Sequence, residues 1–489
     1  MTFAGEPAHL DVAQVYARPG AQPPLGPSRL HLCEGRIASI EPLPTVPPEA
    51  RHCIALPALA NAHDHGRGLR TLAFGARDQP LETWLSELAL EPRVDPYLRS
   101  AVAFARMAEG GIAAANHCHN TQDARALLRE AEGVARAARD VGLRIAFAVP
   151  FAGRNSVVYG PLEPLLKHLP PGDHARLKAM RQPTRTLEEN FDLVEQIAQL
   201  EHAGFQVHYG PVGPQWVDDE AMAAIAQASA DTGRRVHMHL FETRRQREWA
   251  DAHYPRGLLH HLDAIGLLTP RLTVAHAVWL DDADCGLLAE RGVTVSANVS
   301  SNLRLRSGMP PWTRYLDAGL QFGLGLDGMS LDDDEDMLRE MRLAWHQLGA
   351  VDGGERFALA HLFRAVCVRG RLSVTGADGG GELAPDAPAD IMVLDTQHLS
   401  GDRISNDRPD LLDLVVARAT KRDIRQLIVG GRTVVHETRC RTVDLPALEA
   451  ALTAAARQAR VAQPPDAAAI ERLGRALRAH HRCVACGSP

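Results

Sequence analysis

The stretch IALPALANAHDHG, residues 54–66, decides the fold of this chain. It begins as an apolar run with the length of a buried strand, and it ends with His63 and His65. Residues i and i+2 of a strand point to the same face, so the two imidazoles could reach one metal ion. Taken alone, the pair could equally be two polar residues that open a loop. The remaining strands of the chain distinguish these interpretations.

Apolar runs of strand length recur along the chain and alternate with Ala- and Leu-rich helical stretches. Counting 54–61, there are eight, the others being 111–117, 143–149, 205–210, 234–240, 271–276, 292–298 and 321–327. The clearest helical stretches are 122–141, 217–232, 280–290 and 332–348. Alternating strands and helices form parallel sheets with helical crossovers. Eight such units predict an α/β fold, a (β/α)8 TIM barrel, for residues 57–382.

The two flanks of the predicted barrel have a different character. Residues 1–56 and 383–440 are strand-rich, and Gly430–Gly431 is typical of a hairpin turn. We expect the two flanks to pair as one small composite β-sandwich domain. Residues 441–489 predict a C-terminal helical extension and tail, and the chain shows no internal repeat.

Length and charge exclude several classes of protein. The 489 residues allow two to three domains, or one large barrel with an appendage. The net charge of −7 argues against a nucleic-acid-binding protein. No apolar run approaches the roughly 18 residues of a membrane span, and Glu6 and Asp11 interrupt any signal peptide. The eight scattered cysteines form no disulfide framework. We therefore expect a cytoplasmic homo-oligomer, a dimer or a tetramer, with a small-molecule substrate and no nucleic-acid or membrane partner.

Metal-ligand side chains end several of the predicted strands. His239 ends the fifth run, His276 the sixth and Asp327 the eighth, and His63 and His65 end the first. The active sites of TIM barrels lie at this end of the strands. A carboxylate within GLGLDG needs a partner, because burying a lone charge is unfavourable, and a cation would provide one. The chain is also rich in histidine, with 23 residues.

This combination resembles the amidohydrolase superfamily of metal-dependent hydrolases. The resemblance covers roughly residues 54–440 and includes H-x-H after the first strand and H-x-x-E from His239 to Glu242. Further similarity lies in three segments. The first two resemble the branch of the superfamily that contains cytosine deaminase and triazine hydrolase. The third resembles the part of the family's small β-sandwich that follows the barrel in the sequence. The three segments are DQPLETWL (78–85), SSNLRLRSG (300–308) and APADIMVLD (387–395).

The resemblance implies one divalent metal ion, bound by His63, His65, His239 and Asp327. Zinc suits these ligands, and iron would also fit. Many members hold two metals bridged by a carbamylated lysine on the fourth strand. Here residues 205–216 contain no lysine, and none of the three lysines of the chain ends a strand-like run. A site with one metal is therefore favoured.

His237 leaves one ambiguity, because it shares a strand face with His239. The H-x-x-E spacing and the position nearer the strand end favour His239 as the ligand. We expect His237 to lie one layer lower in the barrel.

The implied reaction is attack of a metal-bound hydroxide on an electrophilic ring carbon, followed by loss of ammonia. Asp327 would accept the proton of the water, Glu242 would protonate a ring nitrogen, and His276 would polarise the attacking oxygen. Glu242 could instead be a surface carboxylate that pairs with Arg244 or Arg245.

The substrate contacts are less well defined. Gln215 and Trp216 follow the fourth strand and could bind an amide edge and stack on a flat ring, although a packing loop explains them equally well. His119, with His117, could line the pocket or be structural. Asn302 lies just beyond the seventh strand.

Three functions remain open at this point. A hydrolytic deaminase acting on an aminated nitrogen heterocycle is favoured. The alternatives are hydrolysis of a cyclic amide C–N bond or of a triazine alkylamine or chloride substituent, and a catalytically inactive scaffold. The cluster of His480, His481, Cys483 and Cys486 could bind an accessory metal or belong to a flexible tail.

Overall fold

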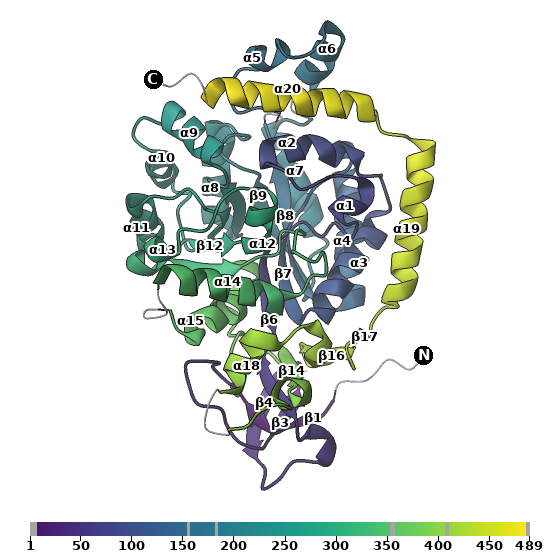
Figure 1. The fold of residues 1–489 in the computed structure, drawn as a ribbon, viewed down its shortest axis with the longest axis vertical. Coiled ribbons are helices and arrows are strands. Elements are labelled where there is room, and N and C mark those ends of the chain that lie inside the picture. Colours follow the sequence, from purple (N-terminus) through teal and green to yellow (C-terminus); the bar gives the residue numbers. More distant parts are fainter. Residues whose placement is uncertain (1–6, 154–156, 181–183, 353–356, 406–409, 486–489) are drawn as a thin grey trace.

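A computed structural model shows a barrel with a smaller β-sandwich at one end and two long C-terminal helices along its side and across its top (Figure 1). The structure describes residues 7–153, 157–180, 184–352, 357–405 and 410–485. The barrel lies in the middle of the molecule, so both flanks of the sequence pack against it.

Eight parallel strands form the barrel, in the order in which they occur along the chain. They are β6 (Leu59–Asp64), β7 (Ile112–Cys118), β8 (Arg144–Phe151), β9 (Phe205–Pro211), β10 (Val236–Leu240), β11 (Leu272–His276), β12 (Thr294–Ala297) and β13 (Gln321–Leu324). The backbone amide of Asp327, just after β13, donates to the carbonyl of His63 at 2.9 Å and brings the last strand back to the first. The predicted (β/α)8 fold is confirmed.

Helices cover the outside of the barrel between successive strands. They are α3 (Pro96–Glu109), α4 (Leu127–Val141), α7 (Leu187–Ala198), α8 (Asp219–Thr232), α9 (Arg244–His253), α10 (Leu258–Ala264), α11 (Asp282–Glu290), α13 (Trp312–Ala318) and α14 (Met337–Asp352). Their ends follow capping rules: the Asp218 side chain accepts from the amide of Ala221 at the start of α8, and Gly233 ends that helix in the left-handed conformation.

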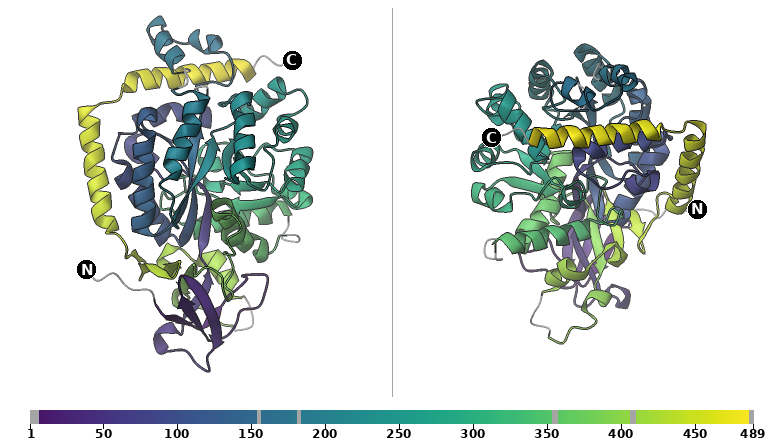
Figure 2. Two further views of the ribbon diagram at one scale, coloured as in Figure 1. Left: turned by 180° about the vertical axis from the view of Figure 1, so that it is seen from behind. Right: turned by 45° about the horizontal axis from the view of Figure 1, so that its top comes forward.

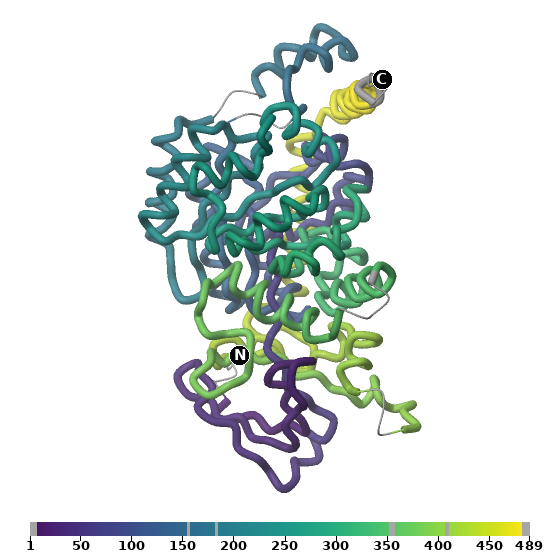
Figure 3. Tube along the Cα trace, turned by 90° about the vertical axis from the view of Figure 1, so that its left-hand side faces the viewer, coloured from purple at the N-terminus to yellow at the C-terminus, as the bar shows by residue number. Residues whose placement is uncertain are grey.

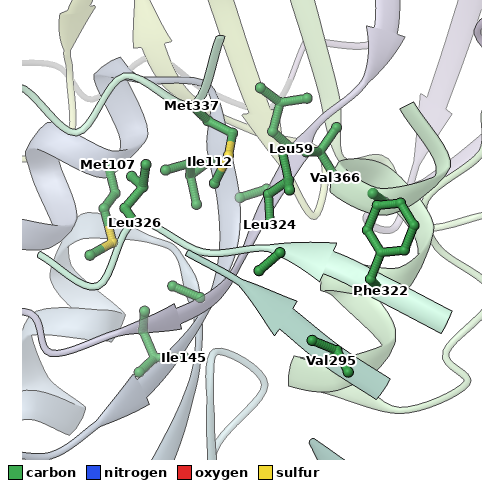
Figure 4. Packing of buried hydrophobic residues seen from close by; sticks show 14 of the residues in the cluster. Leu59, Met107, Ile112, Ile145, Val295, Phe322, Leu324, Leu326, Met337 and Val366 are labelled. Atoms are coloured by element: carbon green, nitrogen blue, oxygen red, sulfur yellow. The ribbon is translucent and has the colours of Figure 1, made fainter. Parts of the chain in front are cut away.

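The barrel strands and the helices around them share one large apolar core. Leu59, Ile112, Ile145, Val295 and Leu324 come from five different strands and are almost completely buried (Figure 4). Strands buried on both faces read as continuous apolar runs, which is why the sequence reveals them.

The apolar run 54–61 is not one strand, as expected, but parts of two. β5 (Cys53–Pro57) pairs antiparallel with β14 (Ile391–Asp395), far away in the sequence, whereas β6 pairs with β7. The chain passes from the β-sandwich into the barrel at Ala58, between two equally buried segments. The run therefore joins the two parts of the molecule.

Two sheets make up the β-sandwich. One contains β1 (His9–Val12), β3 (Ser28–Cys33) and β4 (Arg36–Pro42); the other contains β2 (Gln14–Val15), β5, β14, β15 (Ile424–Val429), β16 (Arg432–His436) and β17 (Arg439–Cys440). Val12, Leu30, Ala55 and Ile391 belong to the apolar cluster between the sheets. The hairpin turn between β15 and β16 is Gly430–Gly431, with φ of 55° and 78°. The exact domain boundaries stay a prediction.

The C-terminal region forms two helices, α19 (Leu445–Ala462) and α20 (Ala467–Ala485). Figure 2 shows α20 crossing the end of the barrel, and Figure 3 shows it next to a small helical insertion. That insertion contains α5 (Glu163–Leu166) and α6 (Pro171–Ala179), and its Leu165 and Leu177 share an apolar cluster with Leu477 of α20. His480 and His481 lie within α20, and Cys486 lies outside the described residues.

Shorter helices complete the fold. They are α1 (Thr71–Phe74), α2 (Leu81–Glu87), α12 (Val299–Arg304), α15 (Leu359–Phe363), α16 (Gly370–Thr375), α17 (Gln397–Ser400) and α18 (Leu411–Arg418). Among the described helices, none is long and apolar enough to cross a membrane. The expected homo-oligomer stays a prediction.

Candidate metal centre

A cavity of about 300 Å³ opens at the carboxyl ends of the barrel strands. His65, His239, Glu242, His276 and Asp327 all line it. They come from four different strands or the loops that follow them, so only the closed barrel brings them together. His63 is completely buried directly beside this group.

Asp327 is at the centre of the cluster. Its Oδ1 lies 3.0 Å from Nε2 of both His63 and His65, and its Oδ2 accepts a 2.5 Å hydrogen bond from Ser301 Oγ. Burial raises the pKa of this carboxyl, but the neighbouring imidazoles of His63 and His65 outweigh burial and hold the pKa well below its usual value. Asp327 is therefore a carboxylate at neutral pH.

The imidazoles are oriented by acceptors behind them. Nδ1 of His65 donates to the carbonyl oxygen of Cys118 at 2.7 Å, and Nδ1 of His239 donates to that of Val212 at 2.7 Å. Nε2 of each ring therefore carries the lone pair. Such carbonyl–histidine contacts typically support metal ligands. Burial lowers the pKa of His65 to about 4 and that of His239 to about 3, so both rings are neutral near pH 7.

His237 lies behind His63 and not in the cavity wall. Its ring stacks on that of His63 with centroids 4.9 Å apart, and its Nε2 lies 2.6 Å from Nδ1 of His63. His239, in contrast, lines the cavity. The geometry thus matches the expectation that His237 occupies a lower layer.

Two overlapping groups of ligand-type atoms are each close enough together to hold an ion. Those of His63, His65 and Asp327 lie within 4.8 Å of one another, and so do those of His63, Cys118 and His239. His63 belongs to both groups, and burial lowers its pKa to about 4. Neutral imidazoles and an ionised carboxylate are the donor set that Zn²⁺ prefers.

Glu242 and His276 form the other side of the cluster. Oε2 of Glu242 lies 3.7 Å from Nε2 of His276, and Oε1 accepts from Ser307 Oγ at 3.2 Å. Burial raises the pKa of Glu242 to about 7. Nδ1 of His276 donates to Oδ1 of Asn302 at 2.9 Å, which leaves Nε2 facing the cavity side. A carboxyl that titrates near neutral pH is suited to proton transfer.

The surface-carboxylate alternative for Glu242 does not fit the structure. Glu242 is 2% exposed. Arg244 pairs with Glu248 at 2.9 Å, and Arg245 lies 4.0 Å from Glu82.

Two of the predicted substrate-contact residues line the cavity and two do not. Trp216 and His119 are in its wall, although both ring nitrogens of His119 are already engaged, with His117 at 3.0 Å and Glu130 at 2.8 Å. Asn302 supports His276, as described above. Gln215 is buried outside the wall.

Sequence reasoning missed several groups that contact the cluster or line the cavity. Ser301 and Ser307 lie in the segment SSNLRLRSG, which signalled the resemblance without revealing which hydroxyl binds which carboxylate. Arg67 and Trp84 line the cavity from loop and helix positions with no strand periodicity. The only sequence signal for Arg67 is its place two residues after the H-x-H pair.

The backbone is strained where the cluster forms. His276 and Asp327 have φ of 70° and 60°, in the left-handed region that non-glycine residues rarely adopt. Gly325 precedes Asp327 by two residues, and a Cβ there would lie 2.3 Å from Asn298 Oδ1. Such strain concentrates at functional sites.

A parallel barrel with imidazoles and a carboxylate at its strand ends defines the class of metal-dependent barrel hydrolases. The chain belongs to the amidohydrolase family, because the model of that family matches residues 54–434. This family is metal-dependent and hydrolyses C–N bonds other than peptide bonds, which confirms the predicted enzyme class.

Several characterised proteins are similar over most of the chain. A 5-methylthioadenosine/S-adenosylhomocysteine deaminase from Syntrophomonas wolfei is 26% identical, covering 80% of this chain and 83% of its own length. An 8-oxoguanine deaminase from Pseudomonas aeruginosa is 29% identical, with 83% and 87% covered. The crystal structure of a zinc-bound adenosine deaminase from Xanthomonas campestris shares the fold, with a TM-score of 0.76, 22% identity and 93% and 98% coverage.

Proposed function

We propose that this chain is a hydrolytic deaminase that releases ammonia from an aminated nitrogen heterocycle at a single metal ion. The observation that carries the proposal is the placement of Glu242. Its buried carboxyl, with a pKa raised to about 7, lies in the same cavity wall as His65, His239 and Asp327. An acid near neutrality beside a metal-ligand cluster is what protonation of a ring nitrogen requires.

His63, His65, His239 and Asp327 would hold the metal. We favour zinc for these nitrogen and oxygen donors, and Fe²⁺ would also fit. No lysine is among the residues that line the cavity in the described part of the chain, which supports one ion over a carbamate-bridged pair. When bound, zinc supplies hydroxide at neutral pH, because it lowers the pKa of water from about 15.7 to about 7.

Different side chains of the protein carry out the different proton transfers. The ionised Asp327 carboxylate accepts the proton of the attacking water. Glu242, whose pKa burial raises to about 7, delivers a proton to the ring nitrogen next to the attacked carbon. His276 hydrogen-bonds the attacking oxygen through Nε2, while Asn302 fixes its ring at 2.9 Å. The amino group then takes up the proton held by Asp327 and leaves as ammonia, and the hydroxyl on the attacked carbon returns a proton to Glu242 as the carbonyl forms.

The relatives favour a purine ring as the first substrate to test. The two deaminases compared above by sequence are named for purine compounds that carry an exocyclic amine. The flat Trp216 ring in the cavity wall is compatible with stacking on such a ring.

An ammonia-release screen tests the proposal. Purified zinc-loaded protein is incubated with aminated purines, pyrimidines, pterins and triazines, and the His63→Ala variant serves as the control that lacks a metal ligand. We expect ammonia from at least one aminated ring with the wild-type protein and none with the variant. Release of alkylamine or chloride, or a ring-opened product, without any ammonia would instead support the alternative hydrolases.

A further inference from the structure

Arg67 is a buried cation without hydrogen-bond partners on two of its nitrogens. It is 4% exposed, and its Nε and Nη1 atoms are buried and unpartnered among the described residues. Burying a charged group without partners is strongly unfavourable. Such a group persists when it has a function that requires it unpaired in the free protein.

Two other buried arginines nearby each lie beside a carboxylate. Arg304 binds both carboxylate oxygens of Asp78 at 3.0 Å and the carbonyl of Ser330 at 2.7 Å. Arg99 also has two nitrogens without a hydrogen-bond partner, Nε and Nη2, but its Nη2 lies 3.2 Å from Glu91 Oε1 and its Nη1 donates to the carbonyl of Asn120 at 2.9 Å. These contacts are those of structural arginines, and Arg67 lacks comparable ones.

Arg67 lines the same cavity as the metal-ligand cluster. Its guanidinium carbon lies 5.4 Å from the ring centroid of Trp84, and Trp84 Nε1 is also buried without a partner. The guanidinium of Arg67 and the indole N–H of Trp84 can only donate hydrogen bonds. Glu242 and Asp327 offer acceptors at the metal end, so a ligand that satisfies both ends carries a donor and an acceptor.

We propose, building on the deaminase function, that Arg67 binds an acceptor oxygen on the substrate and so selects oxygenated rings over rings without such an oxygen. The oxygen is either a carbonyl of the ring or a carboxylate attached to it. A guanidinium fork recognises both groups with charge-assisted hydrogen bonds. The amine to be released then points toward Glu242.

Binding of three matched rings tests the proposal. Purine, hypoxanthine and purine-6-carboxylate differ in the group at C6, and hypoxanthine also carries a hydrogen on N1; calorimetry with zinc-loaded protein measures their affinities. We expect at least one oxygenated ring to bind about 10- to 100-fold more tightly than purine, the range for a hydrogen bond to a charged group. Preference for hypoxanthine identifies a ring carbonyl, and preference for purine-6-carboxylate alone identifies a carboxylate.

Variants assign the preference to one side chain. Arg67→Met should abolish it, whereas Arg70→Met, at an exposed arginine of the same loop, should retain it. Arg67→Lys keeps the charge without the fork and should weaken the preference. Equal affinity for the three rings in the wild-type protein, including no binding of any, or a preference that survives Arg67→Met, would overturn the proposal.

A stability measurement separates this role from a structural one. Because burial disfavours the Arg67 charge more than the nearby carboxylates favour it, and two of its nitrogens lack a hydrogen-bond partner, the melting temperature of Arg67→Met should equal or exceed that of the wild-type protein. A lower melting temperature would indicate that Arg67 is structural and would count against the proposal. The binding measurements need no turnover, so absence of ammonia release from every substrate would contradict the deaminase function without affecting this result.

Discussion

At the residue scale, the division of labour around the cavity can be tested with conservative substitutions. Glu242→Gln keeps the size of the side chain but removes its transferable proton. We expect metal content to be unchanged and kcat to fall by at least about 10²-fold, the lower range for loss of a general acid. Elemental analysis and steady-state kinetics on the same preparations measure the two quantities.

Two further variants serve as controls for this prediction. His63→Ala should lose the metal itself, and His276→Asn should keep the metal with reduced turnover, because its contact is with the reacting oxygen. Equal metal loss in Glu242→Gln and His63→Ala would make Glu242 a ligand. Unchanged turnover in Glu242→Gln would mean that another group delivers the proton.

Glu340 provides a pH-dependent contribution to stability. It is buried on α14, accepts hydrogen bonds from the amide and hydroxyl of Ser300, and burial raises its pKa from 4.5 to about 7. The folded protein therefore binds this proton more tightly than the unfolded chain. The resulting stability is complete below pH 4.5 and is lost as the pH rises toward 7, by up to about 3 kcal/mol.

Glu340→Gln should remove this contribution to the slope of the free energy of unfolding against pH, because the amide does not titrate. The measurement is the free energy of unfolding in urea at pH 5 and pH 8, with Glu220→Gln, an exposed position on α8, as the control. A slope that is the same in the wild-type protein and Glu340→Gln would contradict the prediction.

At the scale of elements, the strand ends were predictable and the loops between them were not. Barrel strands can be recognised in the sequence as apolar runs, and a charged or imidazole side chain at the end of such a run is easily identified. The split of 54–61 into β5 and β6 leaves no such signal, because both halves are equally apolar and buried. Arg67, Ser301 and Ser307 act from irregular or short helical segments, where no periodicity marks which way a side chain points.

The sequence pattern also could not predict where α20 packs. Its amphipathic repeat predicts a helix but not the surface that covers it. In the structure α20 lies against α2, with Arg478 Nη1 3.4 Å from Gln79 Oε1, and α2 supplies Leu81, Trp84 and Leu85 to the cavity wall. The last described helix thus supports one wall of the candidate active site.

We therefore predict that loosening α20 affects substrate binding. Leu477 is 1% exposed, and Leu477→Ala should destabilise its packing by about 2–5 kcal/mol. KM should rise more than kcat falls, and limited proteolysis should cut within α20 sooner. Arg475→Ala, at an exposed position of the same helix, is the control. Unchanged KM together with faster proteolysis would separate α20 from the cavity wall.

At the scale of the whole molecule, metal removal should couple the site to the stability of the fold. The proposed ligands come from β6 and the residue after it, from β10 and from the loop after β13, so a bound ion would link the first, fifth and last strands of the barrel. A ligand that binds only the folded state at 1,000 times its Kd adds about 4 kcal/mol. Chelation should therefore lower the melting temperature and abolish turnover, and one equivalent of zinc should restore both.

The number of metal ions bound per chain is the decisive measurement for this prediction. Elemental analysis of fully active protein should find one tightly bound ion per chain. Two ions per chain, or full activity after complete chelation, would contradict the single-ion site.

The small helical insertion offers a site for selective chemical labelling, because the chain contains few lysines. Two of the three lysines, Lys167 and Lys178, are exposed at or within α5 and α6, next to α20. The third, Lys421, is partly buried and donates from Nζ to the carbonyl of Asp334 at 3.0 Å. An amine-reactive fluorophore would therefore label lysine side chains mainly on this insertion, and its emission would report on movements above the mouth of the barrel.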